Sequence, residues 1–356
     1  MSEEPVFPTA SSAEVWLEDV LKSGASLELK NAMSAVLSVL RDQDKAEGDA
    51  PFLSVVMRTQ GKKLEAFQDA LLTLYGQTDQ DFEVLIMAHN VEAETLGKVQ
   101  DLVDNQAPSF RAKISVYDVN GPGRSLPLNA SLGKARGEYL AFFDDDDLLF
   151  GNWVEAFREA ALKSPGRLIR AIAAVQQMEA EAWPDGRAGF RSTTWPRAEY
   201  PKTFELHRHL ERNHSPFMSV AFPRALFTVW GERFDEVLDV CEDWDMILRG
   251  SGLLGVVSVE ELTVIYRLWT GVTSSYSEHH KDAWEASEAR VREKQNSHPS
   301  IMFEGTAASI VSSVQRVDAV GDPRVSEFMN STSWRVTAPM RRATRLLRRV
   351  TRRSSK

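Results

Sequence analysis

Residues 139–149 constrain this chain most, because a short apolar run leads directly into four aspartates. The apolar part, Tyr139 to Phe143, does not alternate with polar residues, which is typical of a strand buried on both faces. Four adjacent carboxylates cannot be buried without a large desolvation cost, so the strand is predicted to end at Phe143. In open α/β sheets, ligands bind at the carboxyl ends of the strands. The acids are therefore predicted to lie at a binding edge.

The four aspartates, Asp144 to Asp147, repel one another unless a cation lies among them. Hard cations such as Mg²⁺ and Mn²⁺ take oxygen ligands and often share them with substrate phosphates. The alternative interpretation is a solvated acidic turn. We prefer the metal site, because the run ends a core strand and Gly137-Glu138 sets up a tight turn before it.

Strand-like and helix-like patterns alternate from residue 51 to residue 150. An apolar segment at 52–57, for example, is followed by apolar residues at helical spacing between Leu64 and Leu74. This alternation predicts an α/β fold with a parallel, doubly wound sheet. The first strand is followed by neither Gly-x-Gly-x-x-Gly nor a Walker-type loop, so both of those nucleotide-binding classes lose support.

Outside this region the patterns are less regular. A helical hairpin is predicted near the N-terminus, where Ser11 to Glu14 fit a capping box. We expect the hairpin to be a packing appendage, and a dimerisation or partner-docking role is the alternative. A helix is predicted from Glu242 to a stop at Gly250, followed by two short strands at 255–259 and 263–266.

Composition excludes several classes of protein. The single Cys241 cannot form an intrachain disulfide, which fits a reducing cytoplasm. No signal peptide and no run of about 18 apolar residues is found, so no membrane span is expected. The net charge is −9, yet residues 335–356 hold eight Arg, one Lys and no acid, leaving −18 for the rest. An acidic body argues against a nucleic-acid partner, and the basic end predicts an anionic partner of its own.

The order and spacing of several motifs resemble glycosyltransferase family 2. Ser54-Val55-Val56 leads into Arg58-Thr59-Gln60, and Gly137-Glu138-Tyr139-Leu140 leads to the four aspartates. Further along come Gly231-Glu232-Arg233-Phe234-Asp235-Glu236 and Glu242-Asp243-Trp244-Asp245. The resemblance covers roughly residues 51–275, and it implies a GT-A fold with a mixed sheet.

Four segments are predicted on this basis. They are an N-terminal helical extension at 1–50, a GT-A catalytic domain at 51–275, a C-terminal helical region at 276–332 and a basic amphipathic tail at 333–356. The catalytic domain is divided into a nucleotide-sugar-binding half, 51–150, and an acceptor-side half, 151–275.

The resemblance implies where the donor and its metal would bind. The Asp-x-Asp motif of the family maps onto Asp144 and Asp146, which would hold Mn²⁺ or Mg²⁺ between the two donor phosphates. Because four aspartates are adjacent, the motif could also be shifted by one residue, to Asp145 and Asp147. The resemblance implies a further candidate metal ligand, His279 or His280, beyond a loop that closes on the donor in relatives, and a solvated histidine at a helix start is the alternative. The residues that would bind the nucleotide-sugar are Arg58, Thr59, Gln60, His89, Arg124, Asp144 and Asp145.

Two positions depart from the pattern of the family. Its first strand usually ends in Pro, where this chain has Arg58. Its second strand usually ends in an acid that reads the nucleotide base, where this chain has His89-Asn90. The identity of the nucleotide base of the donor is therefore not predicted.

Asp243 is the candidate general base. An inverting transfer needs a group that takes the proton of the acceptor hydroxyl as it attacks the anomeric carbon. The resemblance places such a carboxylate at the start of an acceptor-side helix, whose dipole is expected to keep it ionised. Helix capping is the alternative role for an acid at this position. Glu242 and Trp244 are the further acceptor-side candidates, with a core role as the alternative for Trp244.

These observations predict a metal-dependent, inverting glycosyltransferase of the hexosyl or deoxyhexosyl type. It would move a sugar from a nucleotide-sugar donor to a glycan or lipid-linked glycan in cell-surface polysaccharide synthesis. A sugar nucleotidyltransferase is one alternative, although its Gly-rich basic loop is matched only faintly by residues 58–63. A non-catalytic nucleotide-sugar-binding protein is the other, and a homodimer is left open.

The basic tail predicts where the protein acts. Read at about 100° per residue, seven Arg between Arg341 and Arg353 share one face, opposite Ala343, Leu346, Leu347 and Val350. A basic amphipathic helix of this kind lies on an anionic membrane surface rather than crossing it. The expected location is the cytoplasm, or the inner face of the cell membrane as a peripheral protein. A disordered tail and a docking helix for an acidic protein are the alternatives.

Overall fold

The computed structural model describes residues 12–43, 49–182, 184, 188–270, 281–297, 302 and 305–320. The chain divides into two compact units, residues 1–304 and residues 305–356. The described part of the second unit contains one helix, α13 (Thr306–Val320), and the predicted basic tail lies outside the described residues. The four segments predicted from the sequence stay a prediction.

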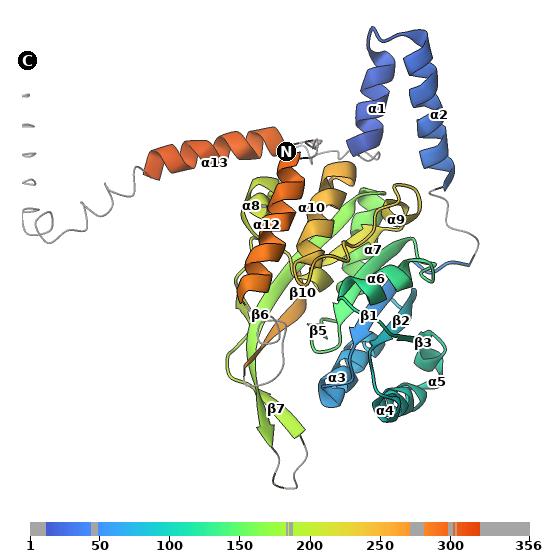
Figure 1. Ribbon diagram of the computed structural model, residues 1–356, viewed down its shortest axis with the longest axis vertical. Coiled ribbons are helices and arrows are strands. Elements are labelled where there is room, and N and C mark those ends of the chain that lie inside the picture. Colours follow the sequence, from blue (N-terminus) through green and yellow to red (C-terminus); the bar gives the residue numbers. More distant parts are fainter. Residues whose placement is uncertain are drawn as a thin grey trace, which may run out of the picture. The chain divides into compact units, whose positions relative to one another are not determined.

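A ten-stranded mixed sheet forms the centre of the first unit (Figure 1). Its main path runs in the order β3-β2-β1-β4-β9-β6-β10-β5, and β7 and β8 pair with β6. β1 to β4 are mutually parallel, and β9 is antiparallel to both of its neighbours, β4 and β6. The strands are β1 (Leu53–Thr59), β2 (Phe82–His89), β3 (Ile114–Val119), β4 (Tyr139–Asp144), β5 (Leu148–Leu149), β6 (Leu168–Ala182), β7 (Ala188–Ser192), β8 (Arg197–Ala198), β9 (Val220–Pro223) and β10 (Val256–Thr270). The predicted α/β architecture with a doubly wound mixed sheet is confirmed.

Helices cover both faces of the sheet, because successive residues of a strand point to opposite sides. In β1, Val55 and Met57 belong to the core cluster that contains residues of α3, α4 and α7, whereas Val56 belongs to the cluster that contains residues of α6, α9 and α10. The helices are α3 (Leu64–Tyr75), α4 (Ala93–Asp104), α5 (Pro108–Arg111), α6 (Ser125–Leu132), α7 (Trp153–Lys163), α8 (Leu206–Glu211), α9 (Ala225–Thr228), α10 (Glu242–Leu254) and α12 (Lys281–Ser297), with a short 3₁₀ turn at Phe217–Ser219.

β4 confirms the interpretation of the apolar run before the aspartates. Tyr139 to Phe143 are all buried, and the strand ends at Asp144, one residue later than predicted. The extra residue is accounted for by pairing, because Asp144 still has a register partner, Arg58, on β1.

Two predictions about the second half are wrong. Helix α10 continues through Gly250 to Leu254, and Gly255, with φ of 73°, ends it. A side chain at Gly250 would approach methyl groups of Leu226 and Leu168 to 3.0 and 3.2 Å, so this glycine serves close packing rather than a helix stop. The two short strands predicted after it are one strand, β10, with register shifts between Val259 and Val264.

The predicted N-terminal hairpin is present as α1 (Ser12–Lys22) and α2 (Leu27–Gln43). α1 contacts α2 and α10, and α2 contacts α9. The hairpin buries Ala13, Leu17 and Leu37, whereas Trp16 and Leu27 stay exposed. Among the described residues, no helix combines the length and the apolarity that a membrane crossing requires.

Candidate active site

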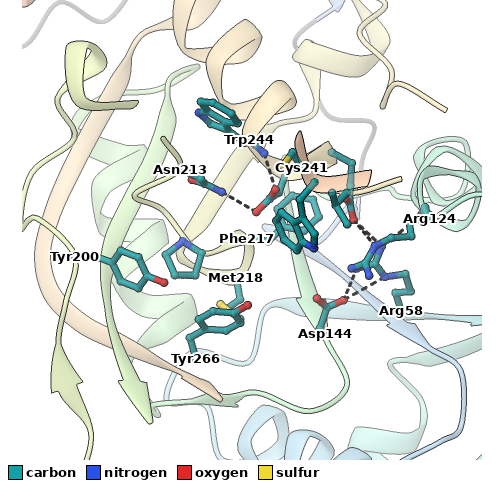
Figure 2. Close-up of a pocket in the computed structure, with 15 residues that line it drawn as sticks. Arg58, Arg124, Asp144, Tyr200, Asn213, Phe217, Met218, Cys241, Trp244 and Tyr266 are labelled. Atoms are coloured by element: carbon teal, nitrogen blue, oxygen red, sulfur yellow. Dashed lines mark hydrogen bonds and ion pairs between the residues drawn. The ribbon is translucent and has the colours of Figure 1, made fainter. Parts of the chain in front are cut away.

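A pocket opens where the carboxyl ends of β1 and β4 face the start of α10 (Figure 2). One wall is charged, and it contains Arg58, Arg124, Asp144, Glu242 and Asp243. The rest is mainly aromatic and apolar, and it contains Tyr200, Asn213, Pro216, Phe217, Met218, Val240, Cys241, Trp244, Tyr266 and Trp284. The pocket therefore joins the two halves of the predicted catalytic domain and also receives a residue of α12.

Arg58 is the centre of the charged wall. Because β1 and β4 are parallel neighbours, their register places Arg58 beside Asp144, and its Nη2 lies 3.0 Å from Asp144 Oδ1. Its Nη1 lies 2.9 Å from Oε1 of Glu242 on α10, and Arg124 Nε reaches the same oxygen at 3.2 Å. Two arginines and two carboxylates from four separate segments thus form one ion-pair network.

The network changes the proton affinity of its members. Burial alone would raise the pKa of Glu242, but Arg124 and Arg58 outweigh burial and lower this pKa to about 2. Burial alone would lower the pKa of Arg58, but Asp144 and Glu242 hold it above its usual value. Both groups are therefore charged at neutral pH.

Asp243 behaves differently from Glu242, although the two are adjacent. Burial, and next the negative charge of Glu242, raise the pKa of Asp243 to about 7. Its Oδ1 accepts the backbone N–H of Trp244 at 2.7 Å, and its Oδ2 accepts an amide N–H of Asn213 at 2.8 Å. The helix dipole was expected to keep this acid ionised, but burial and a neighbouring charge outweigh it. A carboxylate with a pKa near 7 is well matched to general base catalysis.

The backbone at Cys241 aims these acids into the pocket. Cys241 is the N-cap of α10 and has φ of 66°, a left-handed conformation that is uncommon for residues other than glycine. Such strain is found mainly where the surrounding structure holds a functional segment in place. The side chain is partly buried, and burial raises the pKa of its thiol, as expected for a packed rather than a reactive cysteine.

Each of the four aspartates after β4 has a different partner. Asp144 pairs with Arg58, Asp145 accepts the hydroxyl of Thr59, and Asp146 pairs with Lys63. Asp147 is buried and accepts the backbone N–H of Arg267 at 2.6 Å. Lys63 belongs to none of the motifs that predicted the site, although its position in the loop after the first strand was a signal for it.

The cluster carries more negative charge than its partners neutralise. Burial, and then the charge of Asp146, raise the pKa of Asp145 to about 7. Burial also raises the pKa of Asp146, against the effect of Lys63, and burial and Asp146 raise the pKa of Asp147. Excess carboxylate charge of this kind is what a divalent cation relieves, so the donor set fits one.

The described residues contain no group of three or more His, Cys, Asp or Glu that could hold a metal by itself. His279, the predicted third ligand, lies outside the described residues. A magnesium-type ion commonly takes one or two carboxylates and completes its shell with substrate phosphates and water. Asp144 and Asp146 could be the carboxylates of an ion that is held jointly with a phosphorylated ligand, and their role as ligands stays a prediction.

Four predicted nucleotide-binding residues, Thr59, Gln60, His89 and Asp145, do not line this pocket. Thr59 is buried against Asp145, and Gln60 is exposed in the loop that follows β1. His89 donates from Nε2 to the backbone oxygen of Gly121 at 2.9 Å. The side chain of Asn90 bonds both the N–H and the oxygen of Gly121, so these two residues support the loop that leads to Arg124.

Trp244 has the core role that was one of its two alternatives, and its acceptor-side role stays a prediction. It is buried in a cluster with Leu238, Leu248 and Val291, and its Nε1 donates to the backbone oxygen of His209 at 2.6 Å. It also lines the pocket, so the ring forms part of the core and part of the wall.

Several pocket residues were not found by sequence reasoning. Tyr200, Asn213, Phe217, Tyr266 and Trp284 come from segments far apart in the chain, and no motif marks them. The one available signal was the aromatic, Pro-punctuated character of residues 183–200. Only the tertiary fold brings these residues together in one pocket.

Comparisons with known proteins agree with the fold. Residues 54–226 match the family model described as Glycosyl transferase family 2. An uncharacterized glycosyltransferase of Methanocaldococcus jannaschii is 26% identical over 102 residues, which are 29% of this chain and 34% of that protein. The matched part of the chain therefore spans about a third of the length of this curated relative.

Solved structures of a second protein are similar to this chain. S. aureus TarS 1-349 in complex with UDP-GlcNAc has 17% identity, covers 68% of this chain and 70% of its own, and gives a TM-score of 0.48. The complex of TarS 1-349 with UDP has 18% identity to this chain and gives a TM-score of 0.43. The match covers 61% of this chain and 60% of that chain.

Proposed function

Because residues 54–226 belong to glycosyl transferase family 2, we propose that this protein transfers a sugar from a nucleotide-sugar donor to a hydroxyl group of an acceptor. One observation carries the proposal. Asp243, with a pKa of about 7, shares a pocket with the cationic groups of Arg58 and Arg124 and with the first carboxylate of the aspartate run. A base and an anion-binding wall in one pocket suit displacement of a nucleoside diphosphate.

The charged wall is the proposed donor side. Arg58 and Arg124 are oriented by Glu242, so their guanidinium groups are ordered before a diphosphate arrives. Asp144 and Asp146 would hold Mn²⁺ or Mg²⁺ together with the two donor phosphates. When bound, such an ion neutralises the charge that develops on the leaving diphosphate. Lys63, beside Asp146, adds a further cation on this side.

Asp243 is the proposed general base. The acceptor oxygen would form a bond to the anomeric carbon while the bond from that carbon to the phosphate oxygen breaks, which inverts the configuration. The proton of the acceptor hydroxyl would pass to the Asp243 carboxylate. Glu242 assists by keeping its own negative charge next to Asp243, which raises the pKa of the base toward neutrality.

The aromatic walls are the proposed acceptor side. Tyr200, Phe217, Tyr266 and Trp284 present large, largely apolar surfaces in the same pocket as Asp243. A mainly aromatic pocket with few polar groups favours a ligand that has apolar faces and hydroxyl edges, such as a sugar ring. We therefore infer a glycan or lipid-linked glycan as the acceptor, of the kind used in surface-polysaccharide synthesis.

The basic segment at the end of the chain supplies the proposed location. Its seven aligned arginines would hold the protein on an anionic membrane surface at the cytoplasmic face, next to a lipid-linked acceptor. This part of the proposal rests on the sequence, because residues 333–356 lie outside the described residues.

A donor screen followed by a product assay tests the proposal. Thermal shift with a panel of nucleoside diphosphates and Mn²⁺ identifies the base, because a ligand of the native state raises its stability by mass action. Nucleoside diphosphate released from the matching nucleotide-sugar, with acceptor glycan present, is the expected product. Pyrophosphate release from a nucleoside triphosphate would instead favour a nucleotidyltransferase, and binding without turnover would favour a non-catalytic protein.

A further inference from the structure

We infer that Asn213 is a positioning residue for Asp243, and that the backbone N–H of Ser215 sets the orientation in which Asn213 works. This inference rests on the proposed role of Asp243 as the general base. Asn213 is no part of any sequence motif identified in this chain, and it lies 30 positions before Asp243. Figure 2 shows its side chain directed toward the start of α10.

Hydrogen bonding determines which end of the Asn213 amide faces Asp243. The backbone N–H of Ser215 lies 3.0 Å from Asn213 Oδ1, and a backbone N–H can only donate. The atom that faces Ser215 must therefore be the amide oxygen, and the NH₂ group must face the other way. That NH₂ group lies 2.8 Å from Asp243 Oδ2. The amide cannot turn over without losing both hydrogen bonds.

Arg170 forms hydrogen bonds to the segment that carries Asn213 and Ser215. This arginine is fully buried on β6 and donates to Ser215 Oγ at 3.2 Å, to the His214 oxygen at 3.1 Å and to the Lys202 oxygen at 2.9 Å. Among the described residues, no ion pair joins Arg170 to a carboxylate. A buried cation without a counter-charge is costly, so these three acceptors must stay in place.

His209 completes the support of this segment. Its Nδ1 faces the backbone oxygen of Glu205 at 3.1 Å and so must carry the proton, which leaves Nε2 to accept the Ser215 hydroxyl at 2.8 Å. Burial, and then the charge of Arg170, lower the pKa of His209 to about 3, so the ring stays neutral. The hydroxyl of Ser215 is thus oriented from both sides, and the segment has one arrangement.

The hydrogen bond from Asn213 affects the protonation of Asp243. An N–H directed at Asp243 stabilises the charged carboxylate and opposes the effect of burial. The charged groups that act on Asp243 are Glu242 on its own helix, Arg124 before α6 and Asp144 at the end of β4, and the weakly acidic thiol of Cys241 adjoins it. Two neutral donors complete this set, the backbone N–H of Trp244 at Oδ1 and the amide of Asn213 at Oδ2.

The test measures the protonation of Asp243 directly, and it needs no substrate. Protein labelled with ¹³C at the aspartate carboxyl carbons is titrated by NMR, and the Asp243 signal is assigned by its loss in Asp243→Asn. Asn213→Leu should raise the pKa of Asp243 by about one to two units, the range for one hydrogen bond to a charged group. Asn213→Asp should raise it further, because two facing carboxylates share one proton. It also keeps the shape and the Ser215 contact, so it tests the inference even if Asn213→Leu does not fold.

Gln100→Leu is the matched control. It removes a side-chain amide that donates to another aspartate, Asp104 Oδ1 at 3.0 Å, on the exposed side of α4, so the pKa of Asp243 should stay at its wild-type value. An unchanged pKa in both Asn213 variants would overturn the inference, as would a shift of equal size in Gln100→Leu. Once a donor and acceptor are known, the acid limb of the pH profile should move with the NMR value. A protein that transfers no sugar contradicts the proposed function, whereas the NMR result decides the role of Asn213 separately.

Discussion

Arg58 and Glu242 lie 184 positions apart in the sequence, and their side chains form a buried ion pair of 2.9 Å. The pair joins the end of β1 on the proposed donor side to the start of α10 on the proposed acceptor side. Glu242 in turn adjoins Asp243 and raises its pKa. The same carboxylate therefore binds the arginines of the proposed donor side and influences the proton affinity of the proposed base.

Removing the arginine from this pair should destabilise the fold. Arg58→Gln leaves Asp144 and Glu242 without their shared partner, and breaking a buried pair costs about 3–5 kcal/mol. Urea unfolding measures this loss. Arg191→Gln is the control, because Arg191 pairs with Glu179 and Glu181 while its side chain is 57% exposed, and such surface pairs contribute less than about 1 kcal/mol. Equal losses for the two variants would contradict the importance of burial.

Removing the proposed base should stop transfer without harming donor binding. Asp243→Asn keeps the shape of the side chain but cannot accept a proton, so turnover should fall by about 10²–10⁴. Donor affinity, measured by calorimetry, should stay near the wild-type value. Asp239→Asn, an exposed acid two positions before Cys241, should leave both quantities unchanged. Turnover close to wild type in Asp243→Asn would move the role to another residue.

Neutralising Glu242 should shift the pH dependence of turnover. The base acts when ionised, so turnover in the wild type should rise as pH increases through about 7, the pKa of Asp243. Glu242→Gln removes the negative charge beside Asp243, which lowers the pKa of Asp243 and moves this rise to a lower pH. The pH profile of kcat provides the measurement. A profile that stays in place would show that Glu242 does not tune the base.

The metal prediction concerns Asp146. Asp146→Asn removes a charged oxygen ligand, so Mn²⁺ or Mg²⁺ should no longer strengthen nucleoside diphosphate binding, while the fold is kept. Calorimetry with and without the ion measures the effect. Asp118→Asn is the control, since Asp118 is an exposed acid near the end of β3, at the same edge of the sheet. Metal-dependent affinity that survives in Asp146→Asn would remove this residue from the site.

The membrane prediction concerns the basic end of the chain. The full-length protein should float with anionic vesicles and not with neutral ones, and salt should weaken the attachment. A chain ending at Ser333 lacks all eight arginines of residues 335–356 and should stay with the soluble fraction on both kinds of vesicle. Equal flotation of the two proteins on anionic vesicles would place the membrane contact elsewhere.

Several features follow from the sequence alone, because their physical causes are local. The buried strand and its end beside the aspartates follow from the desolvation cost of four adjacent carboxylates, and the structure confirms both to within one residue. The alternation of strand and helix patterns determines a doubly wound sheet. The order of the motifs resembles that of glycosyltransferase family 2, whose model matches residues 54–226, and Asp243 lies in the first turn of α10, as expected from that resemblance.

Other features are decided only by the tertiary structure, because they depend on which distant segments meet. The register of β1 against β4 selects Arg58 as the partner of Asp144, and the position of α10 brings Glu242 to the same guanidinium. Asn213 reaches Asp243 through a segment that no local pattern marks. Proton affinity depends on burial and on the nearest charges in space. For this reason the pKa of Glu242 is lowered and that of Asp243 is raised, although the two residues are adjacent in sequence.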